Sequence, residues 1–307
     1  MSAASAAVVA ATAATVTFRN PISPQSSILH DVLEINIEWG IGRDESASRS
    51  ATGLRVRRVV AMTKQLWLDS IAADGARIAA IAPASLGLPV PSCPGWTVRD
   101  GVVHTAGAHR WATAFLQAGA DSKERFVPDV SDVPDGDAVL QWYAGVNAAL
   151  LDELRRHEPD EPARAFIGRT VAAFWMRRMT QEVSIHRWDL QNSLPGGAEA
   201  LPAWTAADGI TELTQMQIPL IVGKKGLPDA LVGKVIVIEA TDTGDRWTLR
   251  LRADGIDVLD ESVPADVTLR GAASDLDLVL WRRTEPGTVD LVGDRTVLDG
   301  LLDVVII

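Results

Sequence analysis

Glu182 and His186 are four residues apart in a segment whose apolar spacing predicts a helix over residues 170–193. Four residues turn an α-helix by about 400°, so both side chains project from one face, one turn apart. A carboxylate and an imidazole at this spacing can bind one metal ion together. Arg178 and Asp189 lie on the same face of this helix as Glu182 and His186. Charged side chains on a packed helix need partners or a metal.

A third candidate ligand, His104, lies in a second predicted helix that continues to about Gln117. Thr97 is a suitable N-cap for this helix, with Asp100 three residues later as a capping-box partner. His109 follows His104 by five residues. Five residues rotate a helix by roughly 140° beyond one full turn, so the two rings cannot face one point. We choose His104 as the ligand because apolar residues flank it. His109 is then expected behind the ligands or at the surface.

Together, His104, Glu182 and His186 would provide three protein ligands and leave one position open, the pattern of a catalytic zinc site. A divalent ion beside one carboxylate keeps a positive charge, which favours thiolate over thiol, or hydroxide over water. The spacing alone leaves a second interpretation open. Glutamate and histidine four apart are common as a solvated pair, and a buried histidine is more often a packed core residue than a ligand.

The elements that must position these residues are amphipathic helices. We predict four of them, over residues 63–82, 97–117, 137–157 and 170–193. Their modest loops favour an antiparallel bundle. From Pro202 onward the pattern changes, with a helix over 206–221 followed by strand-like segments over 235–240, 247–251, 256–259 and 267–269, then helical stretches over 272–281 and 296–304. The turn at 242–245 predicts a hairpin.

These patterns predict an α+β protein with a four-helix bundle over residues 62–200 and a small α+β domain over 201–307. Residues 1–61 show neither a sustained helix period nor convincing strand pairs. We interpret them as disordered, or as an extension created by a mis-called start. Met62 is the alternative start, because a good amphipathic helix follows it at once.

Composition limits the classes of partner. Hydrophobic residues make up 47% of the chain and charged residues 22%, as in a globular protein. The net charge of −11 disfavours nucleic acid, and no apolar run reaches the length of a membrane span, so we expect neither partner. Cys93 is the single cysteine, which excludes an intramolecular disulfide and fits a cytoplasmic location. No exposed apolar seam is evident, so we expect a monomer.

Two stretches resemble signatures of the mycothiol-dependent maleylpyruvate isomerase family, an actinobacterial branch of the DinB-like metalloenzyme superfamily. The first runs from Val90 to Asp100 and continues through His104 to residues 109–112. The second runs from Met179 to Asp189. The layout of a DinB-like bundle followed by a sterol-carrier-like α+β domain also agrees, over about residues 62–305. The sequence departs at Gly101, where a larger apolar residue is expected.

The resemblance implies that His104, Glu182 and His186 bind a divalent metal, usually zinc, and that mycothiol is the thiol cofactor. Its thiolate would bind at or near the metal. In an isomerase, the thiolate adds to the cis double bond of a maleylpyruvate-like diacid, and rotation and elimination give the trans isomer. In an S-transferase, the thiol attacks an electrophile and stays attached.

A carboxylated substrate needs a cation, which makes Arg178 and Arg110 candidate catalytic residues, with an ordinary ion pair as the alternative role of each. An arginine of the second domain could also close the site, and Arg250 lies on a predicted strand there. Cys93 is expected to pack as a small hydrophobe and is not counted as a ligand. Two alternatives to an enzyme remain: a binding protein for a small ligand, and a regulatory two-domain protein.

Overall fold

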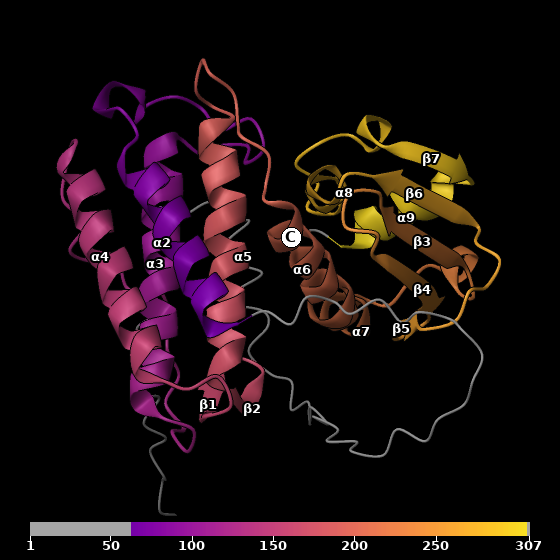
Figure 1. The fold of residues 1–307 in the computed structure, drawn as a ribbon, viewed down its shortest axis with the longest axis horizontal. Helices are drawn as coiled ribbons and strands as arrows, with labels where there is room; N and C mark the ends of the chain where they lie inside the picture. Colours follow the sequence, from indigo (N-terminus) through magenta and orange to yellow (C-terminus); the bar gives the residue numbers. More distant parts are fainter. Residues whose placement is uncertain (1–62, 306–307) are drawn as a thin grey trace, which may run out of the picture.

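The structure, a computed structural model, describes residues 63–305. The predictions made for residues 1–61 and for a start at Met62 therefore lie outside the described residues. Two hydrophobic cores organise the described part, one inside a helical bundle and one between a sheet and its helices (Figure 1). The predicted fold class, a four-helix bundle followed by a small α+β part, is confirmed.

Four long helices form the bundle: α2 (Lys64–Ala79), α3 (Val98–Ala118), α4 (Ala138–Arg156) and α5 (Ala172–Gln191). A short 3-10 turn, η2 (Pro83–Ser85), follows α2. The predicted capping box is present at the start of α3, where Thr97 and Asp100 exchange hydrogen bonds between side chain and backbone. This cap fixes the point at which α3 begins, and with it the register of every side chain along the helix.

The helix directions correct the prediction of a fully antiparallel bundle. Gln117 of α3 bonds Glu153 of α4, while Arg110 contacts Trp142, so these two helices run parallel. Helices α2 and α5 are also parallel, because Thr180 and Ser184 bond the α2 residues at 67 and 74 in the same order. The reason is the segment 119–137. It can extend to about 60 Å, roughly twice the length of α3, and so returns the chain along the bundle.

A short hairpin that the sequence analysis did not predict joins α4 to α5. Its strands are β1 (Pro162–Ala165) and β2 (Gly168–Val171), which pair antiparallel at one end of the bundle (Figure 1). The turn between them ends at Gly168, which has a positive φ, a conformation that glycine adopts without strain. The hairpin sets the point from which α5 runs back through the molecule.

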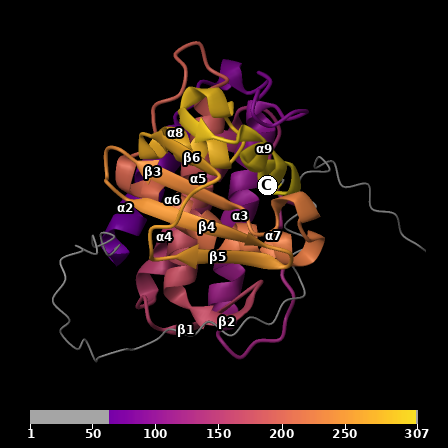
Figure 2. The ribbon, with the colours of Figure 1, turned by 90° about the vertical axis from the view of Figure 1, so that its right-hand side faces the viewer.

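The second part begins with α6 (Ala203–Glu212), a π-helical segment η3 (Leu213–Gln217) and α7 (Ile218–Lys225). Its mixed sheet has the strand order β5-β4-β3-β6-β7 and faces the viewer in Figure 2, with the bundle behind it. The strands are β3 (Val235–Ala240), β4 (Arg246–Arg252), β5 (Gly255–Leu259), β6 (Val267–Gly271) and β7 (Asp290–Gly293). The remaining elements are α8 (Ala273–Leu280), α9 (Arg295–Val304) and the short turns η4 (Asp229–Leu231) and η5 (Pro286–Thr288).

The sheet confirms the hairpin predicted at residues 242–245, since Glu239 pairs with Arg246 across it. Strands β3 and β6 are parallel, and the other neighbours are antiparallel. The edge strand β7 was not predicted. It is four residues long, and three of them are exposed, so it lacks the apolar alternation that identifies a strand.

Helix α5 lies between the two cores. Sixteen of its 20 residues are buried, including polar and charged ones. Its Ile185 and Trp188 belong to the core of the sheet part, whereas Met216 and Leu220 of the second part belong to the bundle core. The two parts are therefore packed against one another along α5, and the polar residues of this helix are held inside the molecule.

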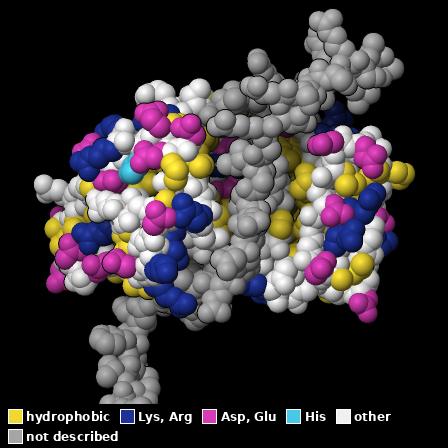
Figure 3. Space-filling model, turned by 90° about the horizontal axis from the view of Figure 1, so that it is seen from below, with side chains coloured by type: hydrophobic (Ala, Val, Ile, Leu, Met, Phe, Trp, Pro, Cys, Tyr) yellow, Lys and Arg dark blue, Asp and Glu magenta, His cyan; other side chains and the backbone are white. Residues whose placement is uncertain are grey.

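The surface carries charges of both signs. On the face shown in Figure 3, Lys and Arg side chains are interspersed with Asp and Glu over both parts. Among residues 63–305, no helix combines the length and the apolar character needed to cross a bilayer.

Candidate metal centre

The three predicted ligands converge between α3 and α5. The Nε2 atom of His104 lies 3.0 Å from Oε1 of Glu182, and Nε2 of His186 lies 3.4 Å from the same oxygen. The three donor atoms all lie within 4.8 Å of one another. Zinc ligands at bond lengths of about 2.0–2.1 Å in a tetrahedron are about 3.3 Å apart, so this spacing fits a tetrahedral ion. Two imidazoles and one carboxylate are also a donor set that zinc accepts.

Close contact between the two helices makes this convergence possible. A Cβ atom on Gly101 would lie 2.5 Å from Cδ2 of Leu190, so a larger residue at this position would force the Leu190 side chain to move. Gly101 therefore allows α3 to approach α5 one turn before His104. This contact gives a structural reason for the residue at which the sequence departs from the family signature.

Asp189 holds His186 in the orientation that a metal needs. The Nδ1–H of His186 donates to Oδ2 of Asp189 at 3.0 Å, so Nε2 is the ring nitrogen that faces Glu182 and would bind a metal once it loses its proton. Burial opposes a charge on this ring, but its hydrogen bonds to Asp189 and Glu182 raise the pKa of His186 to about 9. Ser92 donates to the other oxygen at 2.6 Å. Burial opposes ionisation of Asp189, but the Arg283 guanidinium and His186 hold its pKa below the ordinary value. A carboxylate behind a ligating histidine is the usual support of a protein metal site.

Arg178 supports the carboxylate ligand in the same way. Its Nη2 donates to Oε2 of Glu182 at 2.6 Å, and its Nη1 donates to Glu212 of α6. Although burial opposes ionisation, hydrogen bonds from His104 and His186, together with Arg178, hold the pKa of Glu182 well below its usual value. Arg178 thus lies beside the cluster, as expected from its place on the same helix face as Glu182 and His186. Both ends of its guanidinium are already bound to carboxylates.

Arg283, which the sequence analysis missed, reaches the cluster from the second part. Its Nε donates to Oδ1 of Asp189 at 3.1 Å and its Nη2 to Oδ2 at 3.2 Å. Helix α8 ends just before it: Arg282 has a positive φ, and the N–H of Arg283 bonds the carbonyl of Leu278 at 2.8 Å. This is the hydrogen-bond pattern of a Schellman motif, with arginine in place of the usual glycine. The turn directs Arg283 toward α5.

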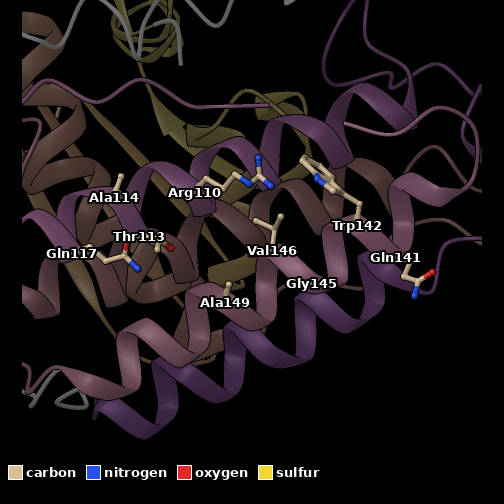
Figure 4. A pocket seen from close by; sticks show the side chains of 9 residues that line it. All are labelled: Arg110, Thr113, Ala114, Gln117, Gln141, Trp142, Gly145, Val146 and Ala149. Atoms are coloured by element: carbon tan, nitrogen blue, oxygen red, sulfur yellow. The ribbon is translucent and has the colours of Figure 1, made fainter. Parts of the chain in front are cut away.

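The other predicted arginines lie elsewhere. Arg110 lines a groove between α3 and α4 (Figure 4), where its Nη2 donates to Asp132 at 2.8 Å and its guanidinium lies 5.0 Å from the centre of the Trp142 ring. Six residues beyond His104 correspond to about 240° of rotation, which turns Arg110 away from the cluster. Arg250 pairs with residues 235 and 257 inside the sheet. The structure therefore brings neither arginine to the three ligands.

Trp96 covers the imidazoles. Its ring centre lies 4.8 Å from that of His104 and 5.9 Å from that of His186. The loop that carries it is closed by a hydrogen bond from the Val90 N–H to the Trp96 carbonyl, and Gly95 turns the chain with a positive φ. Burial of this kind lowers the pKa of His104, which keeps the imidazole neutral and able to ligate.

Cys93 lies behind the cluster. Its Sγ is 3.6 Å from Oδ2 of Asp189, and burial together with Asp189 raises the pKa of the thiol to about 12. Cys93, His186 and Asp189 also place donor atoms within 4.8 Å of one another. Because Asp189 is neutralised by Arg283 and the thiol stays protonated, these groups fit a hydrogen-bonded support better than a second metal site.

His109 is the remaining histidine of α3. It is fully buried next to Tyr143, with ring centres 5.8 Å apart, and it does not join the three donor atoms. Its position agrees with the prediction that His104 and His109 face different directions.

Comparison with known proteins agrees with this architecture. Residues 67–191 match the mycothiol maleylpyruvate isomerase N-terminal domain family, and residues 223–297 match the SCP-2 sterol transfer family. No curated protein matches the chain. A crystal structure of the mycothiol-dependent maleylpyruvate isomerase is similar with a TM-score of 0.53 and 18% identity, covering 75% of this chain and 93% of that one.

A crystal structure of a mutant of that isomerase, with one histidine replaced by alanine, gives the same TM-score of 0.53 at 17% identity, with the same coverage. At such identity the solved structures show a shared fold, and the family match applies to the N-terminal domain. Residues 67–191 belong to the mycothiol maleylpyruvate isomerase N-terminal domain family, as the two sequence signatures predicted.

Proposed function

We propose that this protein is a metal-dependent enzyme that uses mycothiol, either to isomerise a maleylpyruvate-like cis diacid or to transfer the thiol to an electrophile. The observation that carries the proposal is the convergence of His104, Glu182 and His186, each supported by a further buried residue or ring. The thiol is suggested by a similar solved structure, which is of a mycothiol-dependent maleylpyruvate isomerase.

The residues present fit a divalent metal, preferably zinc. His104 and His186 would each provide Nε2, and Glu182 would provide Oε1. When bound there, the metal would supply positive charge that lowers the pKa of a thiol and makes thiolate available at neutral pH. Asp189 keeps the proton of His186 on Nδ1, and Arg178 keeps Oε2 of Glu182 occupied, so that the ligating atoms face one point.

The charges around the cluster favour an anionic ligand. With His186 neutral, as a metal ligand must be, the carboxylates of Glu182, Asp189 and Glu212 are opposed by the guanidiniums of Arg178 and Arg283, which leaves one net negative charge among these five groups. A divalent cation converts this into one net positive charge in a buried region, where the interaction with an anion is strong. Thiolates and dicarboxylates are both anions, so the balance suits the proposed reactants.

We assign Arg178 and Arg283 to positioning. Each guanidinium is bound to carboxylates and each side chain is nearly buried, at 6% and 8% exposure. His104 keeps 15% of its side chain exposed, the largest share among the three ligands, so a reactant from solvent would meet the cluster on this side. Arg110 is outside this arrangement, and the proposed function does not require it.

Turnover assays test the proposal. Zinc-loaded protein would be mixed with mycothiol and maleylpyruvate, with the diacid followed by ultraviolet absorption, and separately with mycothiol and monobromobimane, with adducts followed by mass spectrometry. Turnover that needs both metal and thiol is expected, without consumption of thiol in an isomerase and with stoichiometric consumption in a transferase.

The chain offers a matched pair of controls for these assays. His104→Ala should abolish turnover, while Arg110→Ala should retain it. Stoichiometric zinc without any thiol-dependent turnover of either substrate would contradict the proposal and favour a non-catalytic protein.

A further inference from the structure

Trp281 is a buried residue of the second part that contacts two arginines. It follows the last residue of α8 and is 4% exposed. The Cζ atoms of Arg178 and Arg283 each lie over its ring, 5.7 Å from the ring centre. Arg178 belongs to α5 of the bundle, whereas Arg283 follows α8. One indole ring thus contacts guanidiniums from both parts of the molecule.

These two arginines are the ones that support the candidate metal ligands. Arg178 donates to Oε2 of Glu182 at 2.6 Å. Arg283 donates to Asp189, the carboxylate that accepts the Nδ1–H of His186. The indole ring therefore lies one arginine away from the first of these ligands, and one arginine and one carboxylate away from the second.

The carboxylates hold each guanidinium by its N–H groups. Arg178 binds Glu182 and Glu212 through Nη2 and Nη1, and Arg283 binds Asp189 through Nε and Nη2. These groups lie at the edge of the planar guanidinium, so its flat faces can stack on an aromatic ring. Both side chains are nearly buried, and a ring attracts a cation more strongly when the cation has lost its water.

The turn after α8 adds a second contact. The Nη1 of Arg283 donates to the carbonyl of Trp281 at 2.8 Å. Arg283 is therefore held by one residue in two ways, through the backbone oxygen and through the ring. The bond to the backbone can form with any side chain at this position, so a substitution of Trp281 removes the ring contact and leaves this bond available.

We propose that Trp281 is a positioning residue of the candidate metal centre. Its ring holds both guanidiniums at the places from which they support the ligands on α5. An aliphatic side chain would fill part of the volume but would not attract the cations, so both carboxylates would be held less firmly. This role rests on the metal centre of the proposed function, and it does not depend on the thiol or on its substrate.

The zinc affinity of full-length variants tests this role. Trp281→Leu should weaken zinc binding by roughly 10–100-fold, the usual effect of losing support behind a ligand, as measured by competition with a chromogenic chelator. Trp281→Phe keeps an aromatic ring, so its affinity should stay within about threefold of the wild type. If Trp281→Leu does not fold, Trp281→Met provides another side chain without a ring and should show the same loss.

Trp247→Leu is the matched control for packing. Trp247 is buried in the same hydrophobic core, where its Nε1 donates to Thr211 at 2.9 Å. This variant should lose stability in urea as Trp281→Leu does, yet it should bind zinc as the wild type does. An equal loss of zinc affinity in the two leucine variants would show that packing alone is responsible, and would overturn the positioning role.

A double-mutant cycle tests whether the ring acts through the arginines. Trp281→Leu should weaken zinc binding less in the Arg283→Gln background than in the wild type, whereas equal losses in both backgrounds would contradict this. Equal zinc affinities in Trp281→Phe and Trp281→Leu would overturn the positioning role and leave the metal centre standing. A wild-type protein that binds no zinc would overturn the metal centre itself, and the role of Trp281 with it.

Discussion

Arg283 donates to both oxygens of Asp189, at 3.1 and 3.2 Å, and Asp189 in turn accepts the Nδ1–H of His186 at 3.0 Å. A residue that follows α8 in the second part thus acts on a candidate metal ligand of the bundle through one carboxylate. Removing the arginine would leave Asp189 buried without its cation, which favours protonation of the carboxylate. A protonated Asp189 would hold His186 less firmly.

We therefore expect Arg283→Gln to weaken zinc binding by roughly 10–100-fold, the usual effect of losing support behind a ligand. Competition with a chromogenic chelator would measure the dissociation constant. Arg250→Gln is the control, since Arg250 lies in the sheet away from the cluster, and it should bind zinc as the wild type does. Equal affinity in the Arg283 and Arg250 variants would show that the arginine does not act on the metal site.

A double-mutant cycle tests whether Arg283 works through Asp189. Asp189→Asn should weaken zinc binding by a similar factor of roughly 10–100, because the amide cannot orient His186 as the carboxylate does. If the arginine acts only on this carboxylate, the double variant should lose little more than the weaker binder of the two single variants. Fully additive losses would mean that the two residues act independently.

Cys93 is expected to be chemically inert in the folded protein. With the pKa of the thiol raised to about 12, only about one molecule in 10,000 carries the thiolate at pH 8, and the side chain is buried as well. Iodoacetamide should therefore leave Cys93 unmodified in buffer and alkylate it completely in concentrated urea, as followed by mass spectrometry. Rapid alkylation under native conditions would contradict the position assigned to the thiol behind Asp189.

His109 gives a pH dependence of stability with a definite sign. Burial lowers its pKa to about 4, against about 6.5 in the unfolded chain. Between these values the unfolded chain binds a proton that the folded one does not. The free energy of unfolding should consequently fall as the pH drops from about 6.5 toward 4, by about 2 kcal/mol at pH 5.

Urea unfolding of wild type and His109→Phe at pH 7 and pH 5 would measure this contribution, since effects common to both proteins cancel in the difference. The variant should lose less stability than the wild type on acidification. An identical loss in both proteins would show that His109 takes up its proton as readily in the folded state as in the unfolded one.

Local spacing in the sequence predicted the parts of the site that depend on one helix. Glu182 and His186 could be paired because one turn separates them, and the rotation of α3 distinguished His104 from His109. The same arithmetic places Arg110 on another face from His104, which the choice of Arg110 as a catalytic candidate overlooked. The ligand set itself remains a prediction, although the three donor atoms lie together as expected.

Contacts between distant segments were beyond reach. Nothing near Arg283 in the sequence indicates that the end of α8 lies against α5, and Arg282 has no feature that predicts a positive φ in a residue other than glycine. The capping box at Thr97 was found because its signal is local. The parallel pairing of α3 with α4 was missed because loop composition does not reveal the path of residues 119–137.

The metal content of the purified protein is the most direct test of the central claim. Elemental analysis after zinc loading and dialysis should find about one zinc per wild-type chain and much less than one in Glu182→Gln and His186→Ala, with helical circular dichroism unchanged. Glu182→Gln keeps the shape of the side chain, so its loss of metal would not result from a cavity. No zinc in the wild type, or full zinc in both variants, would contradict the assignment of His104, Glu182 and His186 as the metal centre.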